Sequence, residues 1–257
     1  MSNRGIRILH MYADMLDLYG DGGNMEILKY RCKMRGIDCE ITHYSAGTET
    51  PDFTAYDLIY IGGGADLEQQ HIAADLMKCR EGLKKAYEAG VFFLLICGGY
   101  QLMGKYYRDA DGNDIPGLGL FDYYTVAPNS RKARCIGNIV VRTEITGKPV
   151  DVVGFENHGG QTMDVKKPFG RVVHGNGNCS GGEYEGYCED NVIATYLHGP
   201  LLAKNPEISD KIIHYCIQRV LCASGSDEAY VLTPLDDTLE KQCRNVMIER
   251  LLNKNEK

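Results

Sequence analysis

A buried strand that stops at a cysteine and two glycines places the strongest constraint on the fold of this 257-residue chain. Residues 91–96 read VFFLLI, and Cys97, Gly98 and Gly99 follow directly. A sharp turn from a strand into a helix needs small residues beside its central residue, because a Cβ there would clash. The helix dipole at such a turn favours a thiolate on Cys97. The pattern therefore indicates a nucleophile elbow; the alternative is a buried structural cysteine beside glycines that permit close packing.

The first half of the chain alternates strand-like and helix-like segments. Strands are expected at 6–13, 39–45, 56–64 and 91–96, and helices at 23–36 and 66–90. Strands that read as apolar runs and alternate with helices are typical of a parallel sheet covered on both faces. The predicted fold class is therefore α/β, with a doubly wound, mostly parallel sheet and helices on both faces.

The second half of the chain has a different pattern. Segments 136–144, 150–158, 170–178 and 191–199 resemble strands joined by short turns rich in Gly and Asn, and a helix is expected near 205–222. We therefore expect extra antiparallel strands in this half. The polar tail contains one more amphipathic helical pattern, over 238–254. These patterns divide the chain into a domain of residues 1–222 and a helical C-terminal extension of residues 223–257.

Charge and hydropathy exclude several classes of protein. The net charge is −7 and no basic run is present, whereas a nucleic-acid site needs a patch of Lys and Arg. No stretch approaches the roughly 18–20 apolar residues of a membrane span, and the first residues lack the pattern of a secretory signal. We expect a cytoplasmic protein that neither binds nucleic acid nor inserts into a membrane.

Cysteine spacing and glycine motifs give no sign of a metal or a nucleotide. The ten cysteines should stay reduced in the cytosol, and no two of them have the C-x-x-C spacing of a zinc or redox site. The glycines at 62–64 follow a strand, but they form neither a P-loop nor a dinucleotide motif. We therefore expect no metal and no cofactor in this chain.

A thiolate nucleophile needs a base, and two of the seven histidines are well placed. His71 and His214 lie within helical patterns and are expected either at the surface or as polar residues with satisfied hydrogen bonds. His158 and His198 each follow a strand and precede a glycine. His198 ends an apolar run comparable to the strand before Cys97, so the spacing favours it, although the spacing alone leaves both histidines open.

Three of these segments resemble motifs of class I glutamine amidotransferases. The segment ICGGYQLMG at 96–104 resembles their elbow, and YIGGGADLEQ at 60–69 resembles their first oxyanion loop. The segment ATYLHGPLLAKNP at 194–206 resembles the catalytic-histidine segment of the subgroup related to cobyric acid synthase. The resemblance covers residues 6–220 and implies a flavodoxin-like fold.

Further motifs narrow the resemblance to the family of glutaminase subunits of lipid II isoglutaminyl synthases. The motifs are LYGDGGN at 18–24, RCIGNI at 134–139, GFENHGGQT at 154–162 and GNGN at 175–178. Their order and spacing agree with that family. The resemblance implies hydrolysis of L-glutamine to glutamate and ammonia by a chain whose domain at 1–222 is a class I glutamine amidotransferase.

The resemblance also implies roles for individual residues. Cys97 attacks the side-chain amide, and His198 relays the proton to the leaving ammonia. Backbone N–H groups near Gly63 or Gly64, together with that of Gly98, hold the oxyanion. A water molecule then releases glutamate from the thioester.

Substrate binding is implied for Arg134, which precedes CIGN and matches the position that selects the substrate in the family. A guanidinium fork at this position would bind the α-carboxylate of glutamine bidentately. Arg131 is the fallback for this role. His158 is expected to be structural or part of the site wall, and Tyr100 and Gln101 are expected either to line the pocket or to pack in the core.

The sequence departs from the usual pattern at the third catalytic residue. Most class I enzymes carry His-x-Glu, but here Gly199 and Pro200 follow His198. The enzyme could therefore use a Cys–His pair alone, or take a carboxylate from elsewhere. Glu156 and Asp66 are candidates within the chain, and a partner subunit is a third source.

The resemblance implies a partner that uses the ammonia. That partner is a Mur-ligase-like synthetase subunit, which uses ATP to activate the α-carboxyl of D-glutamate in lipid II and forms D-isoglutamine for peptidoglycan in a heterodimer with this chain. Alternatives are another amidotransferase of the cobyric acid synthase-like group with a different acceptor, a cysteine hydrolase or peptidase of the same superfamily, and a non-enzymatic binding module. The presence of both Cys97 and His198 argues against the last.

Overall fold

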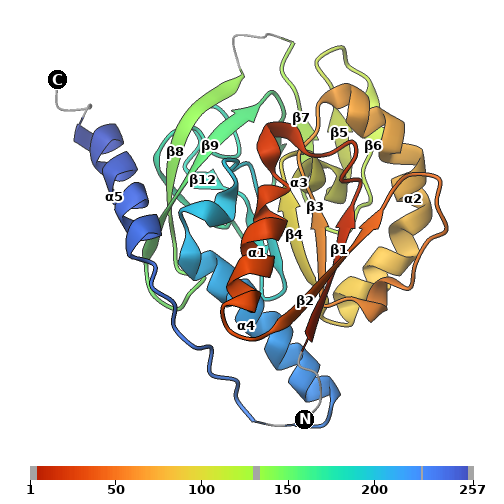
Figure 1. Cartoon of the computed structure of the whole chain (residues 1–257). Coiled ribbons are helices and arrows are strands. Elements are labelled where there is room, and N and C mark those ends of the chain that lie inside the picture. The colour runs from red at the N-terminus through yellow and green to blue at the C-terminus, as the bar shows by residue number, and fades with distance from the viewer. Residues whose placement is uncertain (1–4, 130–133, 227, 254–257) are drawn as a thin grey trace.

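A six-stranded sheet forms the centre of the computed structural model, which describes residues 5–129, 134–226 and 228–253 (Figure 1). The strand order is β13-β14-β4-β3-β1-β2, and every neighbouring pair is parallel except β13–β14. The strands are β1 (Gly5–Met11), β2 (Asp38–Tyr44), β3 (Leu58–Ile61), β4 (Phe92–Ile96), β13 (Tyr187–Glu189) and β14 (Val192–Thr195). The predicted parallel sheet is confirmed.

Helices cover both faces of this sheet, as expected for a doubly wound fold. They are α1 (Gly23–Lys33), α2 (Asp66–Glu88), α3 (Gly98–Met103) and α4 (Pro206–Ala223), with short 3-10 turns at η1 (Leu18–Gly20), η2 (Phe53–Ala55) and η4 (Leu201–Ala203). Contacts join α1 to α4, which lie in front of the sheet in Figure 1, and α2 to α3. The crossover from β1 through α1 to β2 and the crossover from β3 through α2 to β4 run in opposite directions across the sheet, so right-handed connections place α1 and α2 on opposite faces. All residues of β3 and β4 are consequently buried.

Two smaller sheets contain extra strands, and the segments expected at 136–144, 150–158 and 170–178 form antiparallel strands of one of them. The segment expected at 191–199 instead forms β14 of the central sheet, where it pairs in parallel with β4. One of the smaller sheets has the order β10-β7-β5-β6 and the other the order β12-β11-β8-β9, and only β5 and β7 pair in parallel. Their strands are β5 (Tyr106–Arg108), β6 (Asp114–Pro116), β7 (Tyr124–Val126), β8 (Cys135–Thr143), β9 (Val150–His158), β10 (Gln161–Met163), β11 (Gly170–His174) and β12 (Tyr184–Glu185). The strand expected at 170–178 ends at His174, because Gly175 and Gly177 adopt φ values of +108° and +77°.

The C-terminal extension crosses the surface before it forms its helix. An extended segment lies along α1 and α4, where Arg31 pairs with Asp237 at 2.7 Å and Arg35 donates to the carbonyl of Thr233. The predicted helix is present as α5 (Thr238–Leu252). It does not bury an apolar face as an amphipathic helix would: its one buried residue is Arg244, which forms an ion pair with Glu207. The division between residues 222 and 223 stays a prediction.

Within the described ranges, no helix has the length and apolar character needed to cross a bilayer. All ten cysteines are free thiols. His71 and His214 are exposed on α2 and α4, as predicted.

Candidate active site

Cys97 lies at the turn between β4 and α3 in a strained backbone conformation. Its φ is +49°, in a region of backbone conformation that residues other than glycine rarely adopt. A Cβ on Gly99 would lie 2.5 Å from the carbonyl oxygen of Ile61, and a Cβ on Gly98 would lie 3.1 Å from the nitrogen of Gly64. The two glycines are therefore required by close backbone contacts, and the elbow geometry predicted for Cys97 is present.

His198 follows β14 and lies beside the elbow. A Cβ placed on Gly63 would lie 2.8 Å from Cε1 of His198 and 3.2 Å from Cβ of Cys97, so the two side chains meet above this glycine. The parallel pairing of β14 with β4 sets this position, since it aligns Thr195 with Ile96 at the carboxyl ends of both strands. The structure thus brings together the predicted nucleophile and the histidine favoured by the sequence.

Asp21 supplies the carboxylate for His198. Its two carboxylate oxygens lie 3.0 and 2.9 Å from Nδ1 of His198, and both side chains are fully buried. The strand β3 and the turn after it hold Asp21 in place, because the N–H of Gly63 donates to Oδ2 at 3.1 Å and the hydroxyl of Tyr60 donates to the backbone carbonyl of Asp21 at 2.7 Å. The ring nitrogen Nε2 has no partner among the described residues, so it is free for the thiol or a substrate.

The sequence-based candidates for this carboxylate were wrong. Asp66 accepts a hydrogen bond from Tyr107 rather than from His198. Glu156 accepts from the backbone of Gly177 and from Asn176. A partner subunit is also not needed, because Asp21 already occupies the position. The motif LYGDGGN contains Asp21 and was the available signal, but nothing in its spacing links it to a histidine 177 positions away.

The surroundings of His198 favour its charged form. Burial alone would lower the pKa of His198, but the negative charge of Cys97 and the hydrogen bond to Asp21 outweigh burial and raise it to about 10. The histidine therefore stays an imidazolium at neutral pH and can pair with a thiolate.

Two backbone N–H groups are placed to hold an oxyanion. The N–H groups of Gly64 and Gly98 have no backbone or side-chain acceptor among the described residues, and they lie on the two facing turns that meet at the elbow. The N–H of Gly63, in contrast, is taken by Asp21. Of the two loop glycines predicted from the sequence, Gly64 is therefore the one available to the substrate.

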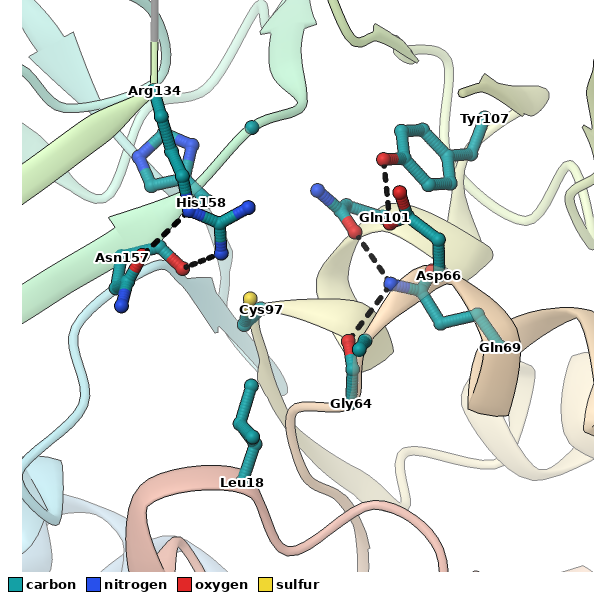
Figure 2. A pocket seen from close by; sticks show the side chains of 12 residues that line it. Leu18, Gly64, Asp66, Gln69, Cys97, Gln101, Tyr107, Arg134, Asn157 and His158 are labelled. Carbon is teal, nitrogen blue, oxygen red and sulfur yellow. Dashed lines mark hydrogen bonds between the residues drawn. The ribbon is translucent and has the colours of Figure 1, made fainter. Parts of the chain in front are cut away.

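A buried amide ties the oxyanion loop to the helix after the elbow. Nε2 of Gln69 donates to the carbonyl of Gly64 at 3.1 Å and to Oε1 of Gln101 at 3.0 Å (Figure 2). Gln101 donates in turn to the hydroxyl of Tyr196. These contacts fix the loop relative to α3, on which Gln101 lies.

Cys97 opens into a small cavity of about 90 Å³. Arg134 lines the cavity together with Gln101 and His158, as predicted (Figure 2). Tyr100 instead packs in the core, where its hydroxyl donates to Asn178. His158 is held in the cavity wall by a hydrogen bond to the carbonyl of Gly160 and by stacking on Tyr196.

Asn157 orients the Arg134 guanidinium from one side. Nε of Arg134 donates to Oδ1 of Asn157 at 2.7 Å, and Nη2 donates to the Asn157 carbonyl at 3.3 Å. The amide of Asn157 donates in turn to the Tyr19 hydroxyl. These bonds leave Nη1 and one Nη2 hydrogen for a ligand, so a carboxylate can still bind end-on. Arg131, the fallback residue, lies outside the described residues.

Comparison with known proteins identifies the family. Residues 7–206 match the model of the CobB/CobQ-like glutamine amidotransferase domain. The chain belongs to this family. Solved structures agree in fold: PurLQS from Thermotoga maritima superposes with a TM-score of 0.57 at 14% identity, covering 84% of this chain and 99% of that one. A crystal structure of a glutamine amidotransferase gives a TM-score of 0.52 at 13% identity, over 81% of this chain and 98% of that chain.

Sequence relatives of this family member fall into two groups. The GatD subunit of lipid II isoglutaminyl synthase from Staphylococcus aureus is 38% identical over 245 residues, which cover 95% of this chain and 96% of that protein. The same subunit from Streptococcus pneumoniae is 36% identical and covers 83% and 81%. A probable cobyric acid synthase from Methanocaldococcus jannaschii is 32% identical over 62% of this chain but only 32% of its own length.

Proposed function

We propose that this chain is the glutaminase subunit of a lipid II isoglutaminyl synthase and hydrolyses L-glutamine to glutamate and ammonia. The observation that carries the proposal is the buried Asp21–His198 pair, which lies against Cys97, and Cys97 in turn lines a small cavity with Arg134. The acceptor is supported by two relatives that bear this name, one of which matches the chain over nearly its whole length. The cobyric acid synthases match over about a third of their own length and give weaker support for another acceptor.

The reaction uses groups already in position. The Cys97 thiolate attacks the side-chain carbonyl carbon of glutamine, and the N–H groups of Gly64 and Gly98 donate to the oxyanion. His198, as imidazolium, gives its proton to the departing nitrogen, so that ammonia leaves and a thioester remains. His198 then takes a proton from water, which attacks the thioester and releases glutamate.

Ammonia is the product that links this chain to a partner. We infer a heterodimer with a Mur-ligase-like synthetase subunit that uses ATP to activate the α-carboxyl of D-glutamate in lipid II, where ammonia then forms D-isoglutamine. The glutaminase subunit itself needs no cofactor and no metal, because the thiol, the imidazole and the backbone donors supply the chemistry. The reaction belongs in the cytoplasm, where the Cys97 thiol stays reduced.

Glutamate release from L-glutamine tests the proposal. The wild type should release glutamate without the synthetase, because Asp21 completes the catalytic group within the chain. Cys97→Ala should release none, whereas Cys188→Ala, at the edge of the sheet, should act like the wild type. Equal release from Cys97→Ala would show that the elbow is not the reaction centre.

A second assay tests the acceptor. With the synthetase subunit, ATP and lipid II, the wild type should amidate lipid II with glutamine as nitrogen source. Cys97→Ala should fail with glutamine but recover amidation when ammonium chloride is added, because only the ammonia supply is lost. Glutaminase activity without any amidation of lipid II would indicate a different acceptor.

A further inference from the structure

The active-site cavity contains a carboxylate that takes no part in the reaction described above. Asp66 is the first residue of α2 and lines the cavity together with Cys97 and Arg134. Figure 2 shows Asp66 and Arg134 on opposite sides of the space above Cys97. The cavity therefore carries a negative charge on one wall and a positive charge on the other.

A buried tyrosine holds this carboxylate in place. The hydroxyl of Tyr107 donates to Oδ1 of Asp66 at 2.8 Å, and Tyr107 is only 1% exposed. Burial first, and then the charge of Asp66, raise the pKa of Tyr107 far above its usual value, so the hydroxyl keeps its proton and remains a donor. Among the described residues, Asp66 has no basic partner and Oδ2 has no donor. Asp66 is thus oriented, but its charge is unbalanced.

A general role at the helix terminus does not account for this arrangement. Acidic residues in the first turn of a helix offset the helix dipole, and Glu68 occupies the same turn of α2. Glu68, however, lines a separate hollow with Asp14 and Asp17 rather than the cavity with Cys97. Only Asp66 combines the first-turn position with a tyrosine donor and a place opposite Arg134.

We propose that Asp66 binds the α-ammonium group of glutamine, opposite the arginine that takes the α-carboxylate. The inference rests on the proposed glutaminase function and names a specificity residue for it. Glutamine carries both charges on one carbon atom, so a cavity with a guanidinium on one wall and a carboxylate on the other matches the zwitterion. Tyr107 acts as the positioning residue for Asp66. Asp66 is solvent-exposed in the free protein, so amides that lack the amino group would not strand a buried charge but would forgo this charge-assisted hydrogen bond and bind less tightly.

The test compares two amides in steady-state assays of ammonia release by the full-length chain, alone and with the synthetase subunit. One is L-glutamine, and the other is 4-carbamoylbutanoate, which is glutamine without its amino group. Asp66→Asn keeps the side-chain size and the contact with Tyr107 but removes the charge. It should raise KM for L-glutamine about ten- to hundredfold, the worth of a charged hydrogen bond, with little change in kcat and none for the des-amino amide. Tyr107→Phe should give a smaller rise in KM, again only for L-glutamine.

Glu68→Gln is the matched control, because it removes the same charge from the same helical turn outside the cavity. It should leave both amides unaffected. An equal loss for both amides in Asp66→Asn, or a rise in KM with Glu68→Gln of the same size, would overturn the inference and leave the glutaminase function standing. A wild type that releases no ammonia from L-glutamine under either condition would instead overturn the proposed function.

Discussion

Asp21 orients His198 and stabilises its protonated form through one ring nitrogen, Nδ1. Its carboxylate accepts from Nδ1, which fixes the orientation of the ring and leaves Nε2 on the side of the thiol. The same carboxylate accepts the N–H of Gly63, so one residue orients both the base and the loop beside it. Removing the charge should therefore change the pH dependence as well as the rate.

Asp21→Asn should lower kcat/KM for glutamine hydrolysis about 10²- to 10⁴-fold, as expected for loss of the group that orients a catalytic histidine. In the wild type, the alkaline limb of the profile of kcat/KM against pH should lie near the raised His198 pKa of about 10. Asp21 stabilises the imidazolium, so its loss should move this limb to lower pH. Asp14→Asn, which changes an exposed carboxylate in the same segment between β1 and α1 but outside the site, should change neither value. If Asp21→Asn lowers kcat/KM but leaves the alkaline limb at the same pH, Asp21 only holds the loop and does not stabilise the imidazolium.

At this scale, the sequence predicts the residues that have local signatures. Cys97 was predictable because two glycines and an apolar strand accompany it, and His198 because it ends a similar strand. Asp21 was not predictable, because its partner His198 lies far along the chain and the loop around Asp21 has no periodic pattern of apolar residues. The orientation of Arg134 by Asn157 is likewise a contact between β9 and the residue just before β8, which no local pattern encodes.

Among the elements, β12 and β14 are joined by a buried acid. Glu185 of β12 accepts from the backbone N–H of Tyr196 at 2.7 Å and from the hydroxyl of Thr195. These bonds favour the ionised form, but burial outweighs them and raises the pKa of Glu185 to about 8. The native protein therefore holds a proton that the unfolded chain has already released between about pH 4.5 and 8.

This difference predicts a pH-dependent stability. Because the native state binds more protons in that window, the contribution of Glu185 to the free energy of unfolding should fall as pH rises from 5 to 8. Glu185→Gln cannot titrate, so its stability relative to the wild type should increase over the same range by up to about 4 kcal/mol, from roughly 1.4 kcal/mol for each unit of pKa shift. Urea unfolding at both pH values measures the effect. Glu183→Gln, in the exposed pair with Arg171, should show the same change in the free energy of unfolding with pH as the wild type. The same pH dependence in Glu185→Gln and the wild type would contradict the prediction.

Element length decides which strands and helices could be predicted. The parallel strands and α1, α2 and α4 have clear apolar patterns and lie close to the predicted ranges. The strands β5, β6, β7, β10, β12 and β13 escape prediction because each has only two or three residues, too few for a period-2 pattern. Their positions come from tertiary pairing with longer neighbours.

On the scale of the whole molecule, the C-terminal extension is attached to the domain by polar contacts and by two partly buried side chains, Tyr230 and Leu232, that pack against the core. Arg31 bonds to both Asp210 and Asp237, and the backbone carbonyl of Tyr230 faces His214. None of the described residues of this extension lines the active-site cavity. The catalytic domain should therefore keep its fold and its site without it.

A variant that ends at residue 226 should fold and hydrolyse glutamine with unchanged kcat and KM. Its free energy of unfolding should fall by about 1–3 kcal/mol, because Arg31 is nearly buried and loses one of its two carboxylates. Glutaminase kinetics and urea unfolding test both statements, and Asp237→Asn in the full-length chain isolates the share of that one contact. Loss of activity in the shortened chain would instead show that the domain does not end near residue 222.

The catalytic residues lie far apart along the chain, with 177 positions between Asp21 and His198 and with Cys97 between them. This separation has a consequence for the order in which the site forms during synthesis. During synthesis, the segment with Cys97 leaves the ribosome well before β14, which carries His198 to its place by pairing with β4. A nascent chain thus holds the nucleophile without its base. Closing so long a loop is also among the slower steps of folding. Consumption of glutamine accordingly begins only when the last parallel strand has joined the sheet, and enzymatic turnover reports on completed folding.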